Sequence, residues 1–562
     1  MATNLALLET AMVLLIAVLA PYCGSSPGLE RCLRRVSAAF SSLASHRGWC
    51  ILLVGVLAFA AKAALAPVLG IRAPAVHDEF SYLLAGDTYA SGRLTNPTHP
   101  MWVHFESFHI DQQPTYMSMY PPLQGGFLAL GKVLFGHPAA GVWVSTAAFC
   151  AALCWMLQGW TAPNWALLGA LLAVLRLALF SAWGNSYFGG APAALGGALV
   201  LGALPRLKAT LRPTDAMLLA TGLLLLANSR PYEGVLLALP VVVALVLWAG
   251  RTRPPFPALL RQAIIPASAL LLLGAALMAY YNWRVFGNAL TLPYEINRKT
   301  YAVVGVFLWQ KPGPVPAYHH QAFRDFYVGY ELLHFQIVKT WHGFVASNFR
   351  KILGGWAFFV GPALTLPLMA AATLLRRREM RFPLAVGVVF GIGMLLNTWF
   401  MPHYAAPATA VVYLLIVYGV RHLRQFRVAG RPVGLLLAAG VPAVCLAMAA
   451  VRVAAGPMQP GSDEPTSWCC SGNGNQERAA LSRQLTVLPE KQLVLVRYGA
   501  EYNGSEWVYN EPNIDRAKVV WARDMEPSKS IELLNYFRDR RVWLLDASRT
   551  PPRLSPYSAA AE

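Results

Sequence analysis

Charged residues are scarce in this chain: they make up 13% of its 562 residues, whereas apolar residues make up 56%. Acidic residues are the rarer kind, with 27 Asp and Glu against 46 Lys and Arg, and the formal net charge is +19. So little charge excludes an ordinary water-soluble protein and is typical of a membrane protein with many spans. Each crossing needs about 20 apolar residues, so the sequence has room for about a dozen.

Several sequence signals of function are also missing. The sequence has no GxGxxG fingerprint, no phosphate-binding loop, no recognised zinc pattern and no internal repeat, so nothing supports nucleotide binding. Its eight cysteines are scattered without metal or redox spacing. Cys469 and Cys470 are adjacent, and because a bond between neighbours closes a strained ring, we expect free thiols or partners elsewhere.

The net positive charge lies in short connectors between apolar runs. Each of five connectors carries three or four basic residues, at 31–47, 206–212, 251–261, 376–381 and 421–431. Loops of this kind stay cytoplasmic under the positive-inside rule. This distribution argues against a nucleic acid partner.

Twelve apolar runs are the expected spans, and they predict an all-α polytopic membrane protein with about 11–12 transmembrane helices. With the basic connectors inside, the segments 71–138 and 282–352 and everything after 452 lie on the other side. The run at 5–21 lacks a basic start and a clean cleavage site, which favours a retained helix over a signal peptide. The runs are 5–21, 49–70, 139–158, 163–181, 187–204, 214–228, 232–249, 263–281, 353–375, 382–400, 405–420 and 432–452.

The chain after residue 456 changes character. Residues 1–456 form the expected membrane domain, and 457–562 alternate strand-like with helical patterns. This alternation predicts a small soluble α/β domain with a partly parallel sheet. The strand-like runs are 492–499, 517–525 and 541–546, and the helical patterns are 475–485 and 528–540.

Ionisable residues in or beside the apolar runs are candidate binding residues, because burying a charge in lipid costs at least ~2.5 kcal/mol. All of them fall on the predicted outer side, where they would converge on one cavity. For Lys62 and Arg176 the alternative is a long cationic side chain that reaches the interface from a helix end. The candidates outside the first external loop are Lys62, Arg176, Tyr187, Arg230, Tyr232, His403 and Tyr404.

The first external loop opens with "HDEFSYLLAGDTYASGRL", in which Asp78 and Glu79 follow His77 directly after an apolar run. Asp87 comes nine residues after Asp78, about 180° away on a continuous helix, so we interpret it as structural. Within this loop His77, Glu106 and Asp111 are the candidate substrate-binding residues. The stretch 122–136 is apolar but short and glycine-broken, which suits an interfacial helix or a re-entrant piece.

Metal binding in this loop is left open. His104, Glu106, His109 and Asp111 are of ligand type and close in sequence, but their spacing matches no zinc pattern. A divalent cation is therefore possible, and the alternative is a satisfied loop with interface histidines. No other cofactor is indicated.

An acid pair beside cations at a lipid surface suits sugar transfer from a lipid-linked phosphate donor. The acceptor hydroxyl must lose a proton as it attacks, so one carboxylate acts as base. The leaving phosphate needs no proton, but it does need positive charge. Direct attack would invert the anomeric centre.

Four stretches make the chain resemble the C-type glycosyltransferases (GT-C), in particular the protein O-mannosyltransferases and the lipid A aminoarabinose transferases. They are "HDEFSYLLAGDTYASGRL", "WGNSYFGGAPAALGGAL", "LLLLANSRPYEGVLLALP" and "PHYAAP", and the resemblance covers roughly residues 49–452. It implies a polyprenyl-phosphate-sugar donor and an inverting transfer on the periplasmic side of a bacterial inner membrane. The family's catalytic acid maps onto Asp78, with Glu79 beside it as orienter or second acid.

One departure from the family concerns the second external loop. Some relatives carry a further acid there, but "SAWGNSYFGG" has none. Either Glu106 or Asp111 supplies the second carboxylate, or a different geometry holds.

Protein, lipid A, another lipid and a polysaccharide all remain possible acceptors. The competing interpretations of the whole chain are a transporter or flippase and a non-catalytic scaffold whose tail binds partners.

Overall fold

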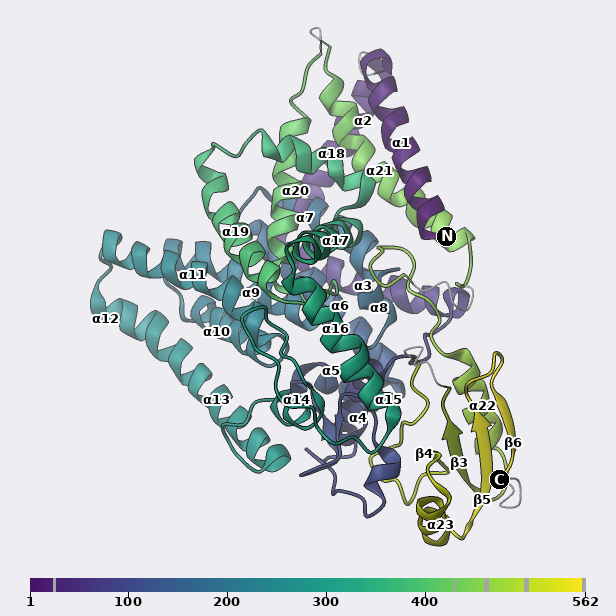
Figure 1. Ribbon diagram of the computed structural model, residues 1–562. Helices are drawn as coiled ribbons and strands as arrows, with labels where there is room; N and C mark the ends of the chain where they lie inside the picture. Colours follow the sequence, from purple (N-terminus) through teal and green to yellow (C-terminus); the bar gives the residue numbers. More distant parts are fainter. Residues whose placement is uncertain (24–26, 429–430, 459–463, 500–504, 558–562) are drawn as a thin grey trace. The chain divides into compact units, whose positions relative to one another are not determined.

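The structure is a computed structural model of the chain, and it describes residues 1–23, 27–428, 431–458, 464–499 and 505–557 (Figure 1). Its contacts divide it into two compact units, each built from three stretches of sequence. The first unit comprises Met1–Ile71, Val142–Ala275 and Ala346–Gly472. The second unit comprises Arg72–Gly141, Ala276–Val345 and Asn473–Glu562.

All twelve predicted apolar runs are helical. Within the described residues, nine helices are long and apolar enough to cross a membrane. Two other runs form shorter apolar helices, α7 (Pro163–Ala173), continued by a π-helical turn to Ala178, and α10 (Pro213–Ala227). The protein is therefore an all-α multi-pass membrane protein, as predicted. The long helices are α1 (Ala2–Cys23), α3 (Arg47–Leu69), α6 (Pro138–Gln158), α9 (Gly190–Thr210), α11 (Pro231–Thr252), α12 and α13 (Phe256–Leu259 and Ile265–Phe286, joined by a π-helical turn), α19 (Arg381–Leu396), α20 (Thr409–Leu423) and α21 (Val433–Ala454).

The remaining run, predicted at 353–375, is not one straight span. Its residues lie in α17 (Trp341–Phe359) and α18 (Gly361–Ala372), which are bent by 104° relative to each other. Gly361 lies at the break with a φ of +60°, a left-handed conformation that glycine adopts without steric cost. Pro362 then occupies the first turn of α18, where its missing N–H removes no helical hydrogen bond.

Two shorter helices complete the first unit. The basic connector predicted at 31–47 contains an amphipathic helix, α2 (Pro27–Ser45), whose charged residues are mostly exposed. The four-residue α8 (Ala182–Asn185) lies in the turn after α7.

The tail forms the α/β domain that the sequence predicts. Its sheet has the order β4-β3-β5-β6, in which β3 is parallel to β4 and β5, whereas β6 is antiparallel to β5. The elements are α22 (Gln476–Thr486), β3 (Lys491–Arg497), β4 (Val519–Arg523), α23 (Pro527–Tyr536), β5 (Arg540–Asp546) and β6 (Arg553–Pro556).

The two faces of this sheet bury different parts of the second unit. Leu493, Leu495 and Val520 belong to a core that also contains Leu84 and Phe105 from the first predicted external loop. The alternate residues along the same strands face the other way and pack with α22. Successive side chains of a strand point to opposite faces of a sheet. One face of the tail's sheet therefore covers the apolar side of the first loop, and the other face packs against α22.

The first loop contains two helices, α4 (His77–Ala90) and α5 (Pro122–Phe135), which approach closely. A Cβ at Gly125 would lie 2.6 Å from the Cβ of Ala85, so glycine at this contact permits the packing. The stretch 122–136, for which the sequence suggests an interfacial helix or a re-entrant piece, is helical from Pro122 to Phe135. The remaining elements of the second unit are the 3₁₀ turn Trp102–Phe105, β1 (Ile110–Asp111), β2 (Met117–Ser118), α14 (Glu295–Tyr301), α15 (Gln321–Arg324), the π-helical turn Asp325–Glu331 and α16 (Leu332–Lys339).

The expectation of free thiols at Cys469 and Cys470 is wrong, because the two form a disulfide with each other. They lie in a turn that already folds the chain back on itself. Glu464 N donates to Cys470 O, and Cys470 N donates to Ser467 Oγ. The turn therefore holds the two neighbouring side chains together. The expectation from sequence considered only the strain of the ring that such a bond closes, and it did not include this turn.

A buried ion pair fixes α1 within the first unit. Glu9 Oε1 accepts from Arg176 Nη1 at 2.7 Å and from Ala363 N at 2.9 Å, and Glu9 Oε2 accepts from Trp468 Nε1 at 3.1 Å. The Arg176 guanidinium also lies 4.4 Å from the centre of the Trp468 ring. Neither member of the pair is exposed by more than 1%. Burying two charges is tolerable here because each one is paired and hydrogen-bonded.

Replacing Glu9 with Gln should destabilise the protein strongly, because it leaves the Arg176 charge buried without its counter-ion. We expect a loss of about 3–5 kcal/mol, measured as the unfolding free energy of the purified protein in detergent. Glu30→Gln is the matched control, since Glu30 pairs with Arg34 on an exposed surface and such pairs contribute about 0–1 kcal/mol. Equal losses in both variants would contradict this account of α1.

Candidate functional site

Helix α4 begins with the acid pair that the sequence singles out. Asp78 and Glu79 both lie in its first turn, where the partial positive charge of the helix N-terminus favours carboxylates. Successive helical residues are about 100° apart around the axis. The two carboxylates therefore meet different surroundings, and the structure gives them different partners.

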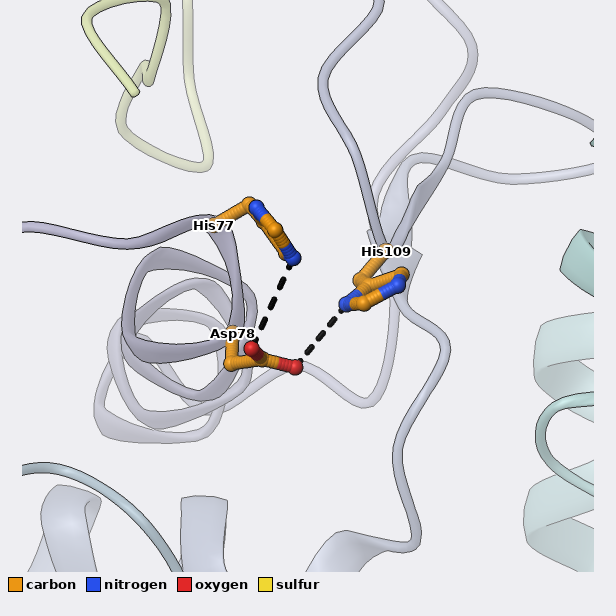
Figure 2. A group of neighbouring side chains, drawn as sticks. All are labelled: His77, Asp78 and His109. Carbon is orange, nitrogen blue, oxygen red and sulfur yellow. Dashed lines mark hydrogen bonds and ion pairs between the residues drawn. The ribbon is translucent and has the colours of Figure 1, made fainter. Parts of the chain in front are cut away.

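Asp78 is held by two side chains from the far end of the same loop, His109 and Tyr120, and Figure 2 shows Asp78 with His109 and with the neighbouring His77. His109 Nδ1 lies 2.9 Å from Asp78 Oδ1, and the Tyr120 hydroxyl donates to the same oxygen. Asp78 Oδ2 lies 3.5 Å from His77 Nε2. The Asp78 side chain is 26% exposed.

A short two-stranded sheet brings His109 and Tyr120 to the same place. β1 pairs with β2 through Ile110 and Ser118, so residues just outside this pair lie side by side. His109 adopts a φ of 61°, which is uncommon for a residue other than glycine. Its carbonyl accepts hydrogen bonds from Ser81 Oγ and Met119 N. These two bonds hold the strained backbone that directs the imidazole at Asp78.

The surroundings keep Asp78 ionised. Burial by itself would raise the pKa of this carboxyl, but the charges of His109 and His77 and the hydrogen bonds from His109 and Tyr120 outweigh it, and the pKa lies well below its usual range. Burial and the neighbouring His109 lower the pKa of His77 to about 4. At neutral pH the site therefore combines an anionic Asp78 with an uncharged His77.

Glu79 is fully buried and is bound on both oxygens. Arg72 Nε donates to Glu79 Oε1 at 2.9 Å, and Arg72 Nη2 donates to Oε2 at 3.2 Å. The Ala75 backbone N–H also donates to Oε2. This arrangement fastens the segment before α4 to its first turn. It offers no carboxylate oxygen to a substrate.

Glu106 and Asp111 are buried at separate places in the second unit. Glu106 accepts from the Tyr301 hydroxyl at 2.7 Å and lies 2.9 Å from His319 Nδ1. Burial would raise its pKa, but the hydrogen bonds of His320 and Tyr301 and the charges of His320 and His319 outweigh burial and lower the pKa. Asp111 Oδ1 accepts from Asn297 Nδ2 at 3.0 Å. Among the described residues no group hydrogen-bonds Asp111 Oδ2, and burial raises the pKa of Asp111 to about 7.

Asp87 has the surroundings of a structural residue, as interpreted from its spacing. Lys132 Nζ donates to Asp87 Oδ1 at 2.7 Å, and the Tyr509 hydroxyl donates to Oδ2 at 2.9 Å. The residue thus joins α4 to α5 and to the tail.

The seven candidates outside the first loop all belong to the first unit. Arg230 lies with its guanidinium 4.4 Å from the centre of the Tyr404 ring, and neighbouring His403 stacks on Phe188. Tyr232 donates to Gly393 O, and Tyr187 is buried.

Lys62 and Arg176 have protein partners of their own. Lys62 donates to the side chain of Asn185 and to Leu179 O. Arg176 pairs with Glu9, so its charge is already compensated inside the protein. The sequence identifies both cations, but it does not indicate these partners.

Three side chains at the Asp78 site are of metal-ligand type. Nitrogen and oxygen atoms of His77, Asp78 and His109 all lie within 4.8 Å of one another. Two imidazoles and a carboxylate are common ligands of Zn²⁺, so this group could hold a divalent cation. Of the four loop residues considered as ligands from sequence, His109 belongs to this group.

The sequence reasoning did not identify Tyr120 or Arg72. Tyr120 lies 42 residues after Asp78, and nothing in "MSMYPPLQ" marks it as a partner of an acid. Arg72 lies seven residues before Glu79, and it could have been found, because it is a cation directly before a buried acidic pair.

No protein-family model and no curated protein matches this sequence. Among solved structures, the chain is similar to ArnT from Cupriavidus metallidurans in the apo state, with a TM-score of 0.48 and 11% identity over 89% of this chain and 93% of that chain. For ArnT bound to undecaprenyl phosphate the TM-score is 0.47, with 12% identity and the same coverage. The chain is also similar to the Archaeoglobus fulgidus oligosaccharyltransferase tethered with an acceptor peptide, with a TM-score of 0.43 and 12% identity over 88% of this chain and 69% of that chain.

Replacing Asp111 with Asn should stabilise the protein increasingly as the pH rises. The folded protein keeps the Asp111 proton at pH values where the unfolded chain has lost it, so the stability of the natural chain falls between about pH 4 and 7. Asn carries no charge, and its amide has an acceptor available in the unpartnered Asn297 Oδ1. We expect an advantage on the order of 2–4 kcal/mol at pH 8, measured by unfolding at pH 5 and pH 8. An advantage that does not change with pH, or the same change in the exposed control Asp539→Asn, would contradict the assignment.

Proposed function

We propose that this chain is a membrane glycosyltransferase that moves a sugar from a polyprenyl-phosphate-linked donor to a hydroxyl of an acceptor. The observation that carries the proposal is the Asp78 carboxylate, which is ionised, partly exposed and fixed in direction by His109 and Tyr120. The donor class rests on the resemblance of the stretch that begins at His77. The proposed activity needs a base at this carboxylate and positive charge for the donor phosphate.

In the proposed reaction the acceptor hydroxyl attacks the anomeric carbon, and the bond from that carbon to the phosphate oxygen breaks. The hydroxyl proton passes to Asp78 Oδ2. Among the described residues this oxygen has only the 3.5 Å contact to His77 Nε2, whereas Oδ1 is bound by His109 and Tyr120. A carboxyl with a lowered pKa is a weak base, so it takes the proton late, when the forming bond has made the hydroxyl acidic. Attack opposite the leaving phosphate inverts the anomeric centre.

Glu79 serves this site as a positioning residue in our proposal. Its two oxygens are occupied by Arg72 and the Ala75 N–H, which fixes the start of α4 and hence the place of Asp78. For the leaving phosphate we propose Arg230 and His403 of the first unit, because a guanidinium and an imidazole are suitable partners for a phosphate anion.

The second unit is built from three stretches of sequence, and their identity supports a site on the periplasmic side. The positive-inside rule places 71–138, 282–352 and the tail on the non-cytoplasmic side. The same three stretches, with slightly different bounds, make up the second unit. Segments separated by a hydrocarbon layer about 30 Å thick cannot pack into one compact unit. The grouping therefore supports one common side, which we propose to be the periplasmic side of a bacterial inner membrane.

Asp78→Asn should abolish transfer and leave the fold intact. Removing the base should lower the rate by about 10²–10⁴-fold, measured with membranes that carry the protein and a panel of labelled polyprenyl-phosphate sugars. Asp87→Asn is the matched control on the same helix and should keep most of the activity, because its partner Lys132 is half exposed. Full activity in Asp78→Asn would remove this residue as the base.

Arg230→Ala should weaken binding of the donor by about 10–100-fold, the amount expected for a lost charge-assisted hydrogen bond. Donor affinity is measured by titrating the purified protein with a polyprenyl-phosphate sugar. Arg206→Ala is the control, since its guanidinium also lies over an aromatic ring, Trp155, at 4.0 Å, but in a connector predicted to be cytoplasmic. Unchanged donor affinity in Arg230→Ala would remove Arg230 from the phosphate site.

A further inference from the structure

The second unit contains a cavity of about 420 Å³ at the carboxyl ends of β3 and β4. Residues Val496–Tyr498 and Arg523–Glu526 form two of its walls, and His319–Ala322 with Asp325 form another. In open sheets with parallel strands, ligands bind at the carboxyl ends of the strands. The volume lies within the range of small-molecule sites, about 300–1,000 Å³. This cavity is distinct from the group around Asp78, none of whose residues lines it.

Arg523 forms a rigid, buried part of the cavity wall. It is 3% exposed, and its Nε donates to Glu106 O at 2.6 Å while its Nη2 donates to Glu506 Oε2 at 3.3 Å. The guanidinium lies between the rings of Tyr498 and Phe323, at 4.7 and 5.2 Å from their centres. A cation fixed in this way costs little ordering when a ligand binds.

Charged groups of both signs line the cavity. Arg497, Arg523 and Lys529 face three carboxylates, those of Asp325, Asp524 and Glu526. Arg497 and Asp524 pair at 2.8 Å, and Arg523 is neutralised by Glu506. Within the described part of the chain, Lys529 Nζ makes no hydrogen bond. A set of mixed sign, in which Arg497 and Arg523 already have carboxylate partners, attracts no strong anion, but it offers many donors and acceptors to a ligand with several hydroxyl groups.

We infer that this cavity, which we call the tail cleft, binds a saccharide that is the acceptor of the proposed transfer. Tyr498 and His319 line the cavity, where aromatic rings suit the apolar side of a sugar, and the charged groups of both signs bind its hydroxyl groups. This inference rests on the proposed function, and it makes the acceptor a glycan rather than a protein or a free phosphate.

The tail cleft and Asp78 are joined by a short piece of chain. Arg523 binds the carbonyl of Glu106, and His109, which binds Asp78, is three residues further on. Three residues span at most about 11 Å. Between them, Phe108 stacks on Phe323 at 4.3 Å and contacts His77 at 5.4 Å. A saccharide of a few units is long enough to lie in the cleft and present its end to Asp78.

Calorimetric titration of the purified full-length protein with maltotriose, mannotriose, chitotriose and inorganic phosphate tests the inference. We expect one saccharide to bind, and Lys529→Ala and Asp325→Asn to weaken it about five- to tenfold, the effect of one lost hydrogen bond. Lys518→Ala is the control, a half-buried lysine just before β4, at the end opposite the cleft, whose Nζ donates to Pro489 O, and it should bind as the natural chain does. With that saccharide as acceptor, Lys529→Ala should raise its KM and leave kcat unchanged.

Binding of phosphate alone, binding of no saccharide, or equal affinity in the natural chain and Lys529→Ala would overturn the inference. These outcomes are separate from the proposed function. Transfer to another acceptor that Asp78→Asn abolishes would keep that function while the tail cleft fails. Saccharide binding that Lys529→Ala weakens, without any transfer, would keep the cleft as a saccharide site and remove the proposed activity.

Discussion

The Asp78 carboxylate remains ionised although most of its side chain is buried, and the chemistry proposed for this chain depends on that combination. Its ionisation is maintained by neighbours that supply charge and hydrogen bonds, while the side chain stays 26% exposed. A fully buried carboxylate would be unreachable, and one in bulk water would have no fixed direction. The strained backbone of His109 and the short sheet of β1 and β2 are what make the arrangement rigid.

This rigidity extends through the second unit because one sheet face covers the first loop. Leu493 and Leu495 lie in the same core as Leu84 of α4, and Arg523 crosses from β4 to the carbonyl of Glu106. The tail is thus part of the structure that supports the acid. A soluble appendage without catalytic relevance would not need buried polar links of this kind, since each one costs desolvation.

The length and apolarity of the runs make the membrane spans predictable. The partners of single side chains are not predictable in this way when they lie far apart in the sequence. Every predicted run is helical, because about 20 apolar residues in lipid have few alternatives. The bend at Gly361 was missed, since a glycine followed by a proline marks a break without fixing its angle. Arg176 was recognised as a cation in an apolar run, but its partner Glu9 lies 167 residues away. Likewise, the acid pair identified the place of the site, while Tyr120 and the direction of His109 depend on tertiary contacts that one sequence does not reveal.

The order in which the parts of the second unit leave the ribosome has a consequence for the cell. Helix α4 is synthesised early, but the core that shields its apolar side is completed by strands beginning at Lys491. Until those last residues emerge, Leu84 and Phe105 lack their final cover. A chain that stops prematurely, even after its last membrane span, would therefore leave the apolar side of the first loop uncovered and become a substrate for quality-control proteases.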